Sequence, residues 1–196
     1  NRASRQGQLR IIGGRWRGRR LPVADVPGLR PTGDRVRETL FNWLQPHLPG
    51  ARCLDLFAGT GALGLEALSR GAAHCDFFDT QRPAIDALRR AVEELGAADI
   101  AAIHAGDALA SGGRGQTWDV VFLDPPFDAD LSKAAIEHLL ATGALAPGAL
   151  LYIEHPAERA LAPGDAFELL RTRRAGAVVY GLYRYPGDRT GPSDHT

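Results

Sequence analysis

Two stretches of this sequence combine acidic residues with residues that shape the backbone, and the first is DLFAGTG at positions 55–61. Its glycines, Gly59 and Gly61, let a backbone turn sharply and approach a ligand closely. Asp55 ends a short apolar run, where a parallel strand would deliver its carboxylate to the ligand-binding edge of an open sheet. Gly64 completes a dinucleotide fingerprint, so the glycines alone also permit NAD. Asp55 favours S-adenosylmethionine, because a carboxylate attracts a cationic methionine end but repels a pyrophosphate.

The second stretch is the corner Asp124-Pro125-Pro126-Phe127, which follows the strongly apolar run 118–123. Two adjacent prolines fix the backbone and remove two N–H donors, so the corner presents the Asp124 carboxylate and carbonyl oxygens as acceptors. An exocyclic amine offers two donors to such a pair, and Phe127 offers a flat surface on which a base can stack. A rigid but inert strand end is the plain alternative. Two strands after the glycine motif, the corner favours methyl transfer to the amine of a nucleic-acid base.

Two further acidic residues follow predicted strands and extend the candidate cofactor site. Asp79 ends the second strand, where a carboxylate can accept hydrogen bonds from both ribose hydroxyls of either cofactor; otherwise it would cap the following helix. Asp107 follows the third strand and could receive an adenine amino group, with Ala108 beside the ring. An aspartate in an ordinary turn is the alternative for Asp107. Phe57 and Ala58 of the glycine motif complete the predicted cofactor-binding set.

The elements that must position these residues alternate along the chain. Apolar runs predict strands at residues 52–57, 73–79, 100–104, 118–124 and 149–155. Helical spacing of apolar residues predicts helices at 32–47, 62–70, 82–95 and 130–142. A final pair of runs, 167–174 and 178–185, reads as a hairpin that adds an antiparallel strand. The sequence therefore predicts an α/β, Rossmann-like fold of the class I S-adenosylmethionine-dependent methyltransferase type, with a mostly parallel seven-stranded sheet.

A basic head precedes this sheet. Residues 1–37 hold ten arginines and two acidic residues, whereas the rest of the chain holds thirteen basic and twenty-one acidic ones and the net charge is zero. Runs 9–14 and 19–23 predict a small hairpin with Trp16 near its tip. Arginine donates paired hydrogen bonds to phosphates and base edges, so the head predicts contact with nucleic acid. A solvated basic tail is the alternative, and Trp16 could stack on a base or cover the core.

These patterns divide the chain into a basic extension at 1–31, a methyltransferase domain at 32–186 and a flexible tail at 187–196. No apolar run approaches the roughly 18 residues of a membrane helix, and no secretory signal opens the chain. No spacing of histidines, cysteines and carboxylates predicts a metal site. Cys53 and Cys75 lie in apolar runs and predict buried free thiols, which fits a cytoplasmic protein.

Three further stretches narrow the prediction: RIIGGRWRGR at 10–19, LRPTGDRVRETLFN at 29–42, and residues 55–69. Together with the Pro-Pro corner, they resemble the RsmD-type bacterial methyltransferases over about residues 10–185. The resemblance implies methyl transfer from S-adenosylmethionine to guanine N2 at position 966 of 16S ribosomal RNA, within the small ribosomal subunit. We expect a monomer.

The resemblance also implies roles for the matching residues. Asp55, Gly59 and Gly61 would contact the amino-acid end of the cofactor, Asp79 its ribose and Asp107 its adenine. Asp79 departs from the family, which usually has glutamate there, so the ribose contact can shift or involve water.

The same resemblance assigns the substrate side of the site. Asp124 and the Pro125 carbonyl would hold the guanine amine, Pro126 would keep the corner rigid, and Phe127 would stack on the base. The residues implied to grip RNA are Arg10, Arg15, Trp16, Arg17, Arg19, Arg20, Arg30, Arg35 and Arg37.

Three other functions stay open at this point. A DNA adenine-N6 or protein glutamine methyltransferase could use the same Pro-Pro corner, although the small head offers little room for a target-recognition domain. A non-catalytic RNA-binding protein could retain the fold. An NAD-dependent oxidoreductase would bind nicotinamide and not S-adenosylmethionine. His104 and His155 end predicted strands, and we expect neither to be a catalytic base.

Overall fold

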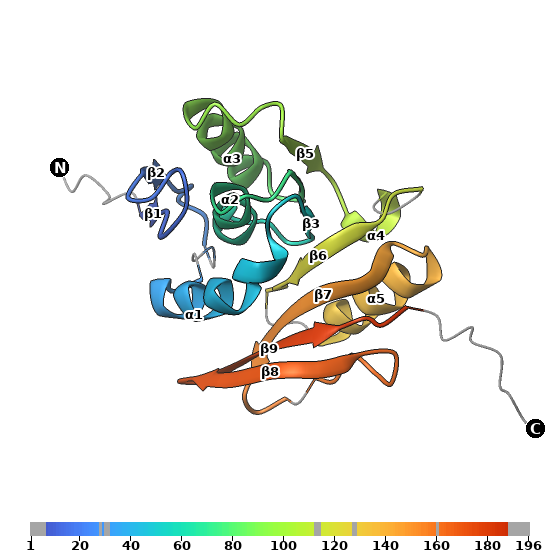
Figure 1. Ribbon diagram of the computed structural model, residues 1–196. Helices are drawn as coiled ribbons and strands as arrows, with labels where there is room; N and C mark the ends of the chain where they lie inside the picture. The colour runs from blue at the N-terminus through green and yellow to red at the C-terminus, as the bar shows by residue number, and fades with distance from the viewer. Residues whose placement is uncertain are drawn as a thin grey trace, which may run out of the picture.

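The computed structural model describes residues 7–27, 29, 32–111, 115–126, 129–159 and 161–187 of the 196-residue chain. Within them, seven strands form one sheet in the order β5-β4-β3-β6-β7-β9-β8 (Figure 1). The strands are β3 (Arg52–Asp55), β4 (His74–Asp79), β5 (Ala101–Ala105), β6 (Trp118–Leu123), β7 (Leu145–Pro156), β8 (Glu168–Ala175) and β9 (Val178–Arg184). Strands β3 to β7 run parallel, while β9 is antiparallel to both β7 and β8. The predicted sheet is thereby confirmed.

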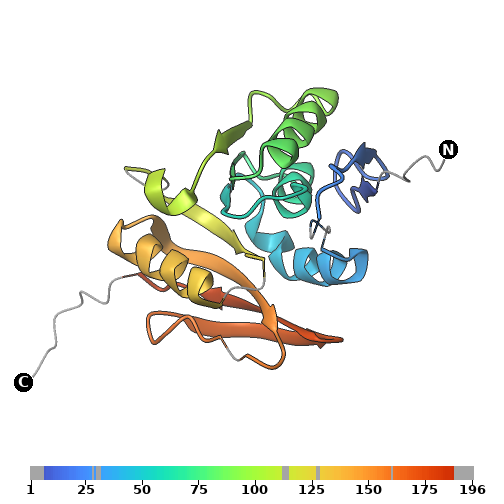
Figure 2. The same ribbon diagram turned by 180° about the vertical axis from the view of Figure 1, so that it is seen from behind.

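Helices connect the parallel strands and cover both faces of the sheet (Figures 1 and 2). They are α1 (Asp34–Leu44), the short 3₁₀ helix η1 (Gln45–His47), α2 (Ala62–Ser69), α3 (Arg82–Glu94), α4 (Ala108–Ser111) and α5 (Ala129–Ala141). The sequence predicted each of the longer helices to within a few residues. It did not predict α4, because a four-residue helix is too short to show a period.

Within the main sheet, the largest difference in strand bounds concerns β7, which begins at Leu145 and not at residue 149. Leu145 pairs with Trp118, and the register then shifts so that Leu150 pairs with Val120. Pro147 lies in this interval and cannot donate to the ladder. The early part of the strand therefore lacks the apolar pattern by which the later part was recognised.

Strand residues alternate between two hydrophobic clusters, one on each face of the sheet. Cys53, Val120 and Phe122 pack with buried residues of α1, α2 and α3. Leu54 and Val121 point the other way and pack with buried residues of α4 and α5. The glycine motif and the Pro-Pro corner follow β3 and β6, so both are held by strands that are buried on two sides.

The two cysteines behave as the sequence predicts. Cys53 and Cys75 lie opposite each other on β3 and β4, and both are buried free thiols. Burial raises the pKa of the Cys75 thiol well above its ordinary value. Neither thiol is therefore available for reaction in the folded state.

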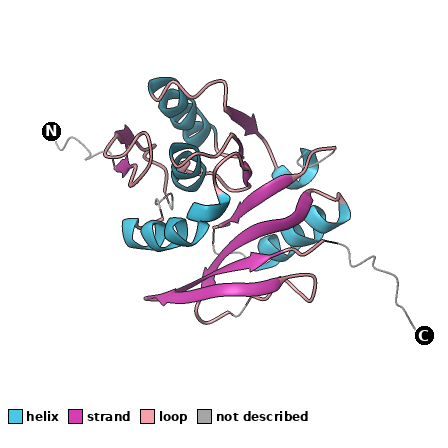
Figure 3. Cartoon of the chain, viewed as in Figure 1, coloured by secondary structure: helices cyan, strands magenta, loops and turns pink. Residues whose placement is uncertain are grey.

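The predicted N-terminal hairpin is present as strands β1 (Gln8–Arg10) and β2 (Arg20–Pro22), which pair with each other and not with the main sheet (Figure 3). Its apolar side chains are not a separate cluster. Leu9, Ile11, Leu21 and Val23 are buried in the same cluster as α1, α2 and α3. The head is therefore docked on the domain, in contrast to the alternative of a solvated tail.

A single buried carboxylate connects the hairpin to the domain. Glu66, in the middle of α2, is 0% exposed and accepts hydrogen bonds from two hairpin amides, Ile12 N–H at 3.0 Å and Gly13 N–H at 2.8 Å. It also accepts from the guanidinium groups of Arg70, at 2.9 Å, and Arg37, at 3.5 Å. A buried charge with this many donors is well compensated, whereas one without them would be very costly.

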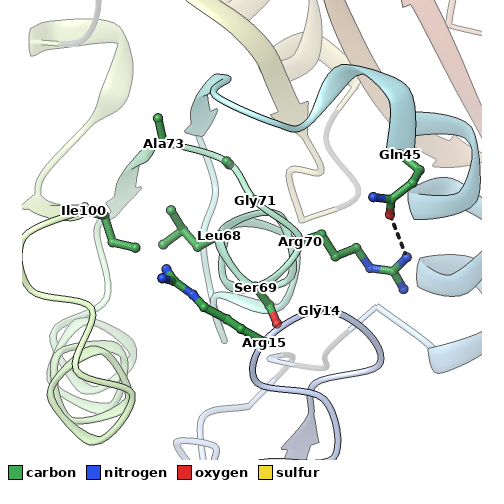
Figure 4. Close-up of a pocket in the computed structure, with 10 residues that line it drawn as sticks. Gly14, Arg15, Gln45, Leu68, Ser69, Arg70, Gly71, Ala73 and Ile100 are labelled. Atoms are coloured by element: carbon green, nitrogen blue, oxygen red, sulfur yellow. Dashed lines mark hydrogen bonds between the residues drawn. The ribbon is translucent and has the colours of Figure 1, made fainter.

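The tip of the hairpin rests on the C-terminal end of α2 (Figure 4). The Ser69 hydroxyl donates to the Gly13 carbonyl at 2.6 Å and accepts from the Trp16 N–H at 3.1 Å. The Arg15 N–H donates to the Ser69 carbonyl at 2.9 Å. Gly14 has a φ of 77°, and a Cβ there would overlap the Ser69 backbone. Only glycine therefore allows this close approach.

The structure corrects the assignment of Arg37 to RNA binding. Its side chain is 1% exposed, and it donates to Asp34 at 2.7 Å and to the backbone carbonyls of Thr32 and Arg10 at 3.0 Å each. Burial lowers the pKa of Arg37, and the charges of Glu66 and Asp34 oppose this effect. Counting charges along the sequence does not distinguish such a buried arginine from an exposed one.

The division of the chain at residue 31 stays a prediction, as does the flexible tail at 187–196, of which the structure describes only Gly187. Among the described residues, none of the helices has the length and apolar character that a membrane span requires.

We expect Glu66→Gln to lower the free energy of unfolding by about 3–5 kcal/mol, because the buried guanidinium groups of Arg37 and Arg70 both lose the charge of this carboxylate. The measurement is urea unfolding, combined with hydrogen exchange at the Ile12 and Gly13 amides. The control is Glu94→Gln, which removes an exposed ion pair with Arg19 and should change stability by less than about 0.5 kcal/mol. Equal losses in the two variants would show that the attachment of the hairpin does not depend on Glu66.

Candidate active site

A cavity of about 750 Å³ opens at the carboxyl ends of β3, β4, β6 and β7. Parallel sheets bind ligands at this edge. The cavity is lined by Pro27, Leu29, Thr32, Gly33, Asp55, Leu56, Phe57, Ala58, Gly59, Thr60, Ala62, Leu63, Asp79, Thr80, Gln81, Gly106, Asp107, Ala108, Asp124, Pro125, Pro126, Leu131 and Glu154. Both motifs singled out in the sequence therefore reach one site, together with the linker that follows the hairpin.

The glycine motif forms the turn between β3 and α2. Gly61 is the N-cap of α2 with a φ of 77°, and a Cβ there would overlap the side chain of Leu88. The turn brings its backbone to the cavity wall. Gly59 N–H donates to Asp79 at 2.7 Å, so the end of β4 fixes the conformation of the turn.

Asp55 lies buried beneath this turn and accepts a hydrogen bond from the Gly64 N–H at 3.2 Å. Burial raises the pKa of Asp55 to about 7. The Gly64 N–H opposes the shift, and the nearby Asp79 adds to it. A cation bound in the cavity would lower the pKa of this carboxyl group, because a nearby positive charge favours its ionised form.

Asp79 accepts hydrogen bonds from two backbone amides and also lines the cavity. Its Oδ2 accepts from Gly59 N–H, and its Oδ1 accepts from Gln81 N–H at 2.8 Å. A carboxylate has about four acceptor positions, so one on each oxygen stays available for a diol. The alternative role, as N-cap of α3, falls to Gln81.

Asp107 and Ala108 reach the cavity at the start of α4. Asp107 Oδ1 accepts a hydrogen bond from the Leu109 N–H at 2.9 Å. This contact is typical of an aspartate in a turn, which was the alternative role of Asp107. Because Asp107 also lines the cavity, the turn and a role towards a ligand are compatible. Ala108 is buried beside it.

The Pro-Pro corner follows the last residue of β6. Asp124 is half-buried and accepts a hydrogen bond from the Thr32 hydroxyl at 3.3 Å. Burial raises the pKa of Asp124 to about 8, the charges of Glu154 and Asp55 add to the shift, and the Thr32 hydroxyl opposes it. Phe127 lies outside the described residues, so its stacking role stays a prediction.

Two of the cavity residues that were not predicted as site residues interact with Asp124. Glu154 lies near the end of β7, and Thr32 lies in the linker before α1. A usable signal existed for Glu154, because it is the only acidic residue in the apolar run 149–155. Thr32 offered no such signal, since its contact with Asp124 joins residues that are far apart in the sequence.

The histidine near the end of β5 is not among the residues that line this cavity. His104 contacts Asp76 at 2.9 Å, and the Trp118 indole N–H donates to the same carboxylate at 3.2 Å. Neither His104 nor Asp76 lines the cavity. This agrees with the expectation that His104 is no catalytic base.

A smaller hollow of about 440 Å³ lies at the opposite end of α2 (Figure 4). Arg15, Gln45 and Arg70 line it, with Leu68 and Ile100 as apolar walls. It contains no carboxylate, and the Ser69 hydroxyl is engaged with the hairpin. We interpret this hollow as the seam between the hairpin and the domain and not as a second reaction site.

The residues expected to grip RNA fall into different environments. Arg17, Arg20 and Arg35 are exposed and form no ion pair with a described residue. Arg10 and Arg19 are paired with Asp34 and Glu94 at the surface.

Two remaining members of the set form a stacked pair. The Arg15 guanidinium lies 4.2 Å from the centre of the Trp16 ring, and Trp16 packs partly against the main core. Trp16 therefore covers the core, as one of its two predicted roles required. Arg30 lies outside the described residues.

The charge of the lining decides between the two candidate cofactors. Five carboxyl groups line the described part of the cavity, whereas no lysine or arginine does so. Such a wall attracts a cationic ligand and repels a pyrophosphate. The sulfonium cation of S-adenosylmethionine suits this acidic lining, whereas the anionic pyrophosphate of NAD does not.

Comparisons with known proteins agree with this geometry. A family model described as conserved hypothetical protein 95 matches residues 9–184. The chain is 47% identical to the ribosomal RNA small subunit methyltransferase D of Escherichia coli (strain K12), over 92% of each chain. It is 42% identical to the protein of the same name from Haemophilus influenzae, over 91% of this chain and 95% of the relative.

A solved structure extends the agreement to three dimensions. The putative methyltransferase yhhF from Escherichia coli has a TM-score of 0.85 and 44% sequence identity, covering 91% of this chain and 98% of its own. The likeness therefore extends over nearly the whole of both chains.

We expect Asp124→Asn to change the pH dependence of stability. In the unfolded chain an aspartate has a pKa of about 3.9, whereas the pKa of Asp124 in the folded chain is about 8. Between these values the folded state holds more protons, so the free energy of unfolding falls as pH rises. Asparagine cannot ionise, so the variant should lose less stability between about pH 4 and pH 8 and should keep this advantage at higher pH.

Thermal melting from pH 5 to pH 9 measures this difference. At pH 9 the Asn variant should melt at least about 3 °C above the unchanged chain, whereas at pH 5 the two should agree within about 1 °C. A constant offset across the range would mean that Asp124 does not carry the raised pKa.

Proposed function

Since the chain belongs to the family described as conserved hypothetical protein 95, we propose that it transfers a methyl group from S-adenosylmethionine to the exocyclic N2 amine of a guanine in small-subunit ribosomal RNA. The resemblance described above points to guanine 966 of 16S ribosomal RNA. Relatives at 47% and 42% identity that carry the name ribosomal RNA small subunit methyltransferase D support the RNA and the subunit. We further propose that the protein acts as a monomer on RNA within the small subunit.

The observation that carries the proposal is the acidic cavity that contains both the glycine turn and the Pro-Pro corner. When bound, S-adenosylmethionine supplies a methyl group that is already activated by a sulfonium. The protein therefore needs no nucleophile of its own, and its contribution is orientation and electrostatics. Asp55, Asp79 and Asp107 hold and orient the cofactor along the ends of β3, β4 and β5.

The Pro-Pro corner acts on the amine that accepts the methyl group. The lone pair of a guanine amine is delocalised into the ring and is a poor nucleophile. Hydrogen bonds from the amine to the Asp124 carboxylate and the Pro125 carbonyl favour a pyramidal nitrogen and localise that pair. The same acceptors stabilise the positive charge that grows on the nitrogen. Asp124 then accepts the released proton, a role that its raised pKa favours.

The target base must leave its stack to reach this corner. The rigid, docked hairpin gives the RNA a fixed surface beside the domain. Its exposed arginines, Arg17 and Arg20, and Arg35 at the start of α1 are suited to hold phosphates. A non-catalytic RNA-binding protein would not require the complete set of carboxylates that surrounds the corner.

The direct test is transfer of labelled methyl from S-adenosylmethionine to small ribosomal subunits that lack the modification. The unchanged chain should label guanine N2, and Asp124→Asn should reduce the rate at least about 100-fold, because the amine loses a charged acceptor in the transition state. Asp119→Asn is the matched control. Its carboxylate accepts from the Arg52 N–H at 2.9 Å, at the other end of β6, and this variant should retain full activity.

The outcomes of this test are distinct. Label on an adenine or on DNA would replace the proposed substrate with one of the rival amino-methyltransferases. Cofactor binding without transfer to any of these substrates would favour a binding protein. Because Asp124→Asn is expected to be at least as stable as the unchanged chain, loss of label in this variant reflects chemistry and not misfolding.

Exposed arginines should contribute to RNA binding through phosphate contacts. We expect the double variant Arg17→Gln with Arg20→Gln to weaken binding to small subunits and to reduce the slope of log K against log salt by roughly 1 to 2, as for two lost contacts. Arg171→Gln with Arg173→Gln removes two exposed arginines of β8 and serves as the control. An identical slope in both doubles would exclude the hairpin from the RNA interface.

A further inference from the structure

Glu154 has no role in the function proposed so far, although it lies in the same cavity as Asp124. We infer that Glu154 is a specificity-determining residue, which accepts a hydrogen bond from the N1–H of the target guanine while Asp124 holds the neighbouring amine. This inference rests on the proposed function, because it concerns the base that the same site accepts.

The sheet places the two carboxyl groups side by side. Strands β6 and β7 are parallel neighbours, and their register pairs Leu123 with Ile153. Asp124 follows the last residue of β6 and Glu154 is the next residue of β7, so the two lie next to each other towards the carboxyl edge of the sheet. Both line the cavity, and their charges interact, because Glu154 contributes to the raised pKa of Asp124.

The Glu154 carboxylate is held by one of its oxygens and offers the other. The hydroxyl of Tyr152, a fully buried residue, donates to Glu154 Oε2 at 2.8 Å. Among the described residues, none donates a hydrogen bond to Oε1, and no buried side-chain oxygen or nitrogen lacks a partner. Oε1 is therefore accessible. Glu154 is one of the residues that line the cavity, so this oxygen is open to a ligand there.

Guanine is the common base that fits two acceptors arranged in this way. Its Watson–Crick edge carries an exocyclic NH₂ beside a ring N1–H, which are two adjacent donors. Adenine and cytosine carry an NH₂ beside a ring nitrogen that is an acceptor. With its amine at Asp124, guanine would donate N1–H to Glu154, whereas adenine would turn a lone pair towards the carboxylate. A site with buried acceptors rejects a base that leaves them unpaired.

The electrostatics of the site agree with such a ligand. Burial raises the pKa of Glu154, and the Tyr152 hydroxyl opposes this shift. Glu154 and Asp124, with Asp55 nearby, therefore repel one another when ionised. Two adjacent N–H donors would stabilise both ionised carboxylates at once. Only a base with adjacent donors can provide this stabilisation.

The test compares methyl transfer to two kinds of small subunit, one with guanine and one with adenine at the target position. The Gln side chain of Glu154→Gln can donate to adenine N1 as well as accept from guanine N1–H. We expect the ratio of guanine to adenine kcat/KM to fall roughly 10- to 100-fold in this variant. Cofactor affinity, measured by calorimetry, should change by less than about twofold. Glu158→Gln, an exposed change just after β7, is the control and should leave the ratio unchanged.

A second variant separates base reading from general damage. Glu154→Asp keeps the charge but shortens the side chain, so it should lower guanine kcat/KM without creating activity on adenine. An unchanged ratio in Glu154→Gln, or loss of cofactor binding in either variant, would overturn the inference. Absence of guanine labelling by the unchanged chain would instead contradict the proposed function itself.

Discussion

The buried carboxylate of Glu66 is the interaction on which the arrangement of this molecule depends. It lies in α2, the helix that begins at the glycine turn, and it binds the hairpin amides and the guanidinium group of Arg37. Arg37 in turn donates to the Thr32 carbonyl, and the Thr32 hydroxyl donates to Asp124. A continuous series of polar contacts thus runs from the basic hairpin to the Pro-Pro corner. Because charges buried without partners are very costly, this series fixes the position of the linker that forms one wall of the cavity.

Much of the fold could be predicted because the sheet is buried on both faces. Central strands carry apolar runs, such as 120–123 in β6 and 149–153 in β7, and α1 and α3 each show one apolar stripe. The β7 start was missed where Pro147 interrupts the pattern, and α4 is too short to have a period. Arg37 was assigned to RNA because it belongs to a basic segment of sequence. Only the packing of α1 against α2 shows that its charge is directed into the core.

The candidate site was predictable to the extent that its residues end strands. Asp55 and Asp79 end β3 and β4 and Asp124 follows β6, so the parallel topology brings them to one edge. The contribution of Glu154 depends on the register between β6 and β7, and that of Thr32 depends on the path of the linker. Neither register nor path can be read from local sequence, since both result from packing between distant segments.

The attachment of the hairpin has a consequence for how this protein can vary among organisms. Glu66 and Ser69 hold the hairpin from the same short helix whose first residue follows the glycine turn. The hairpin is therefore not a portable module that could be exchanged with another nucleic-acid-binding element. A graft would have to bring its own partners for Glu66 and Ser69, and a glycine at the position of Gly14, or the cofactor turn would lose its support. The side chains on the hairpin surface are thus free to vary, while its backbone is constrained by its contacts with Glu66 and Ser69.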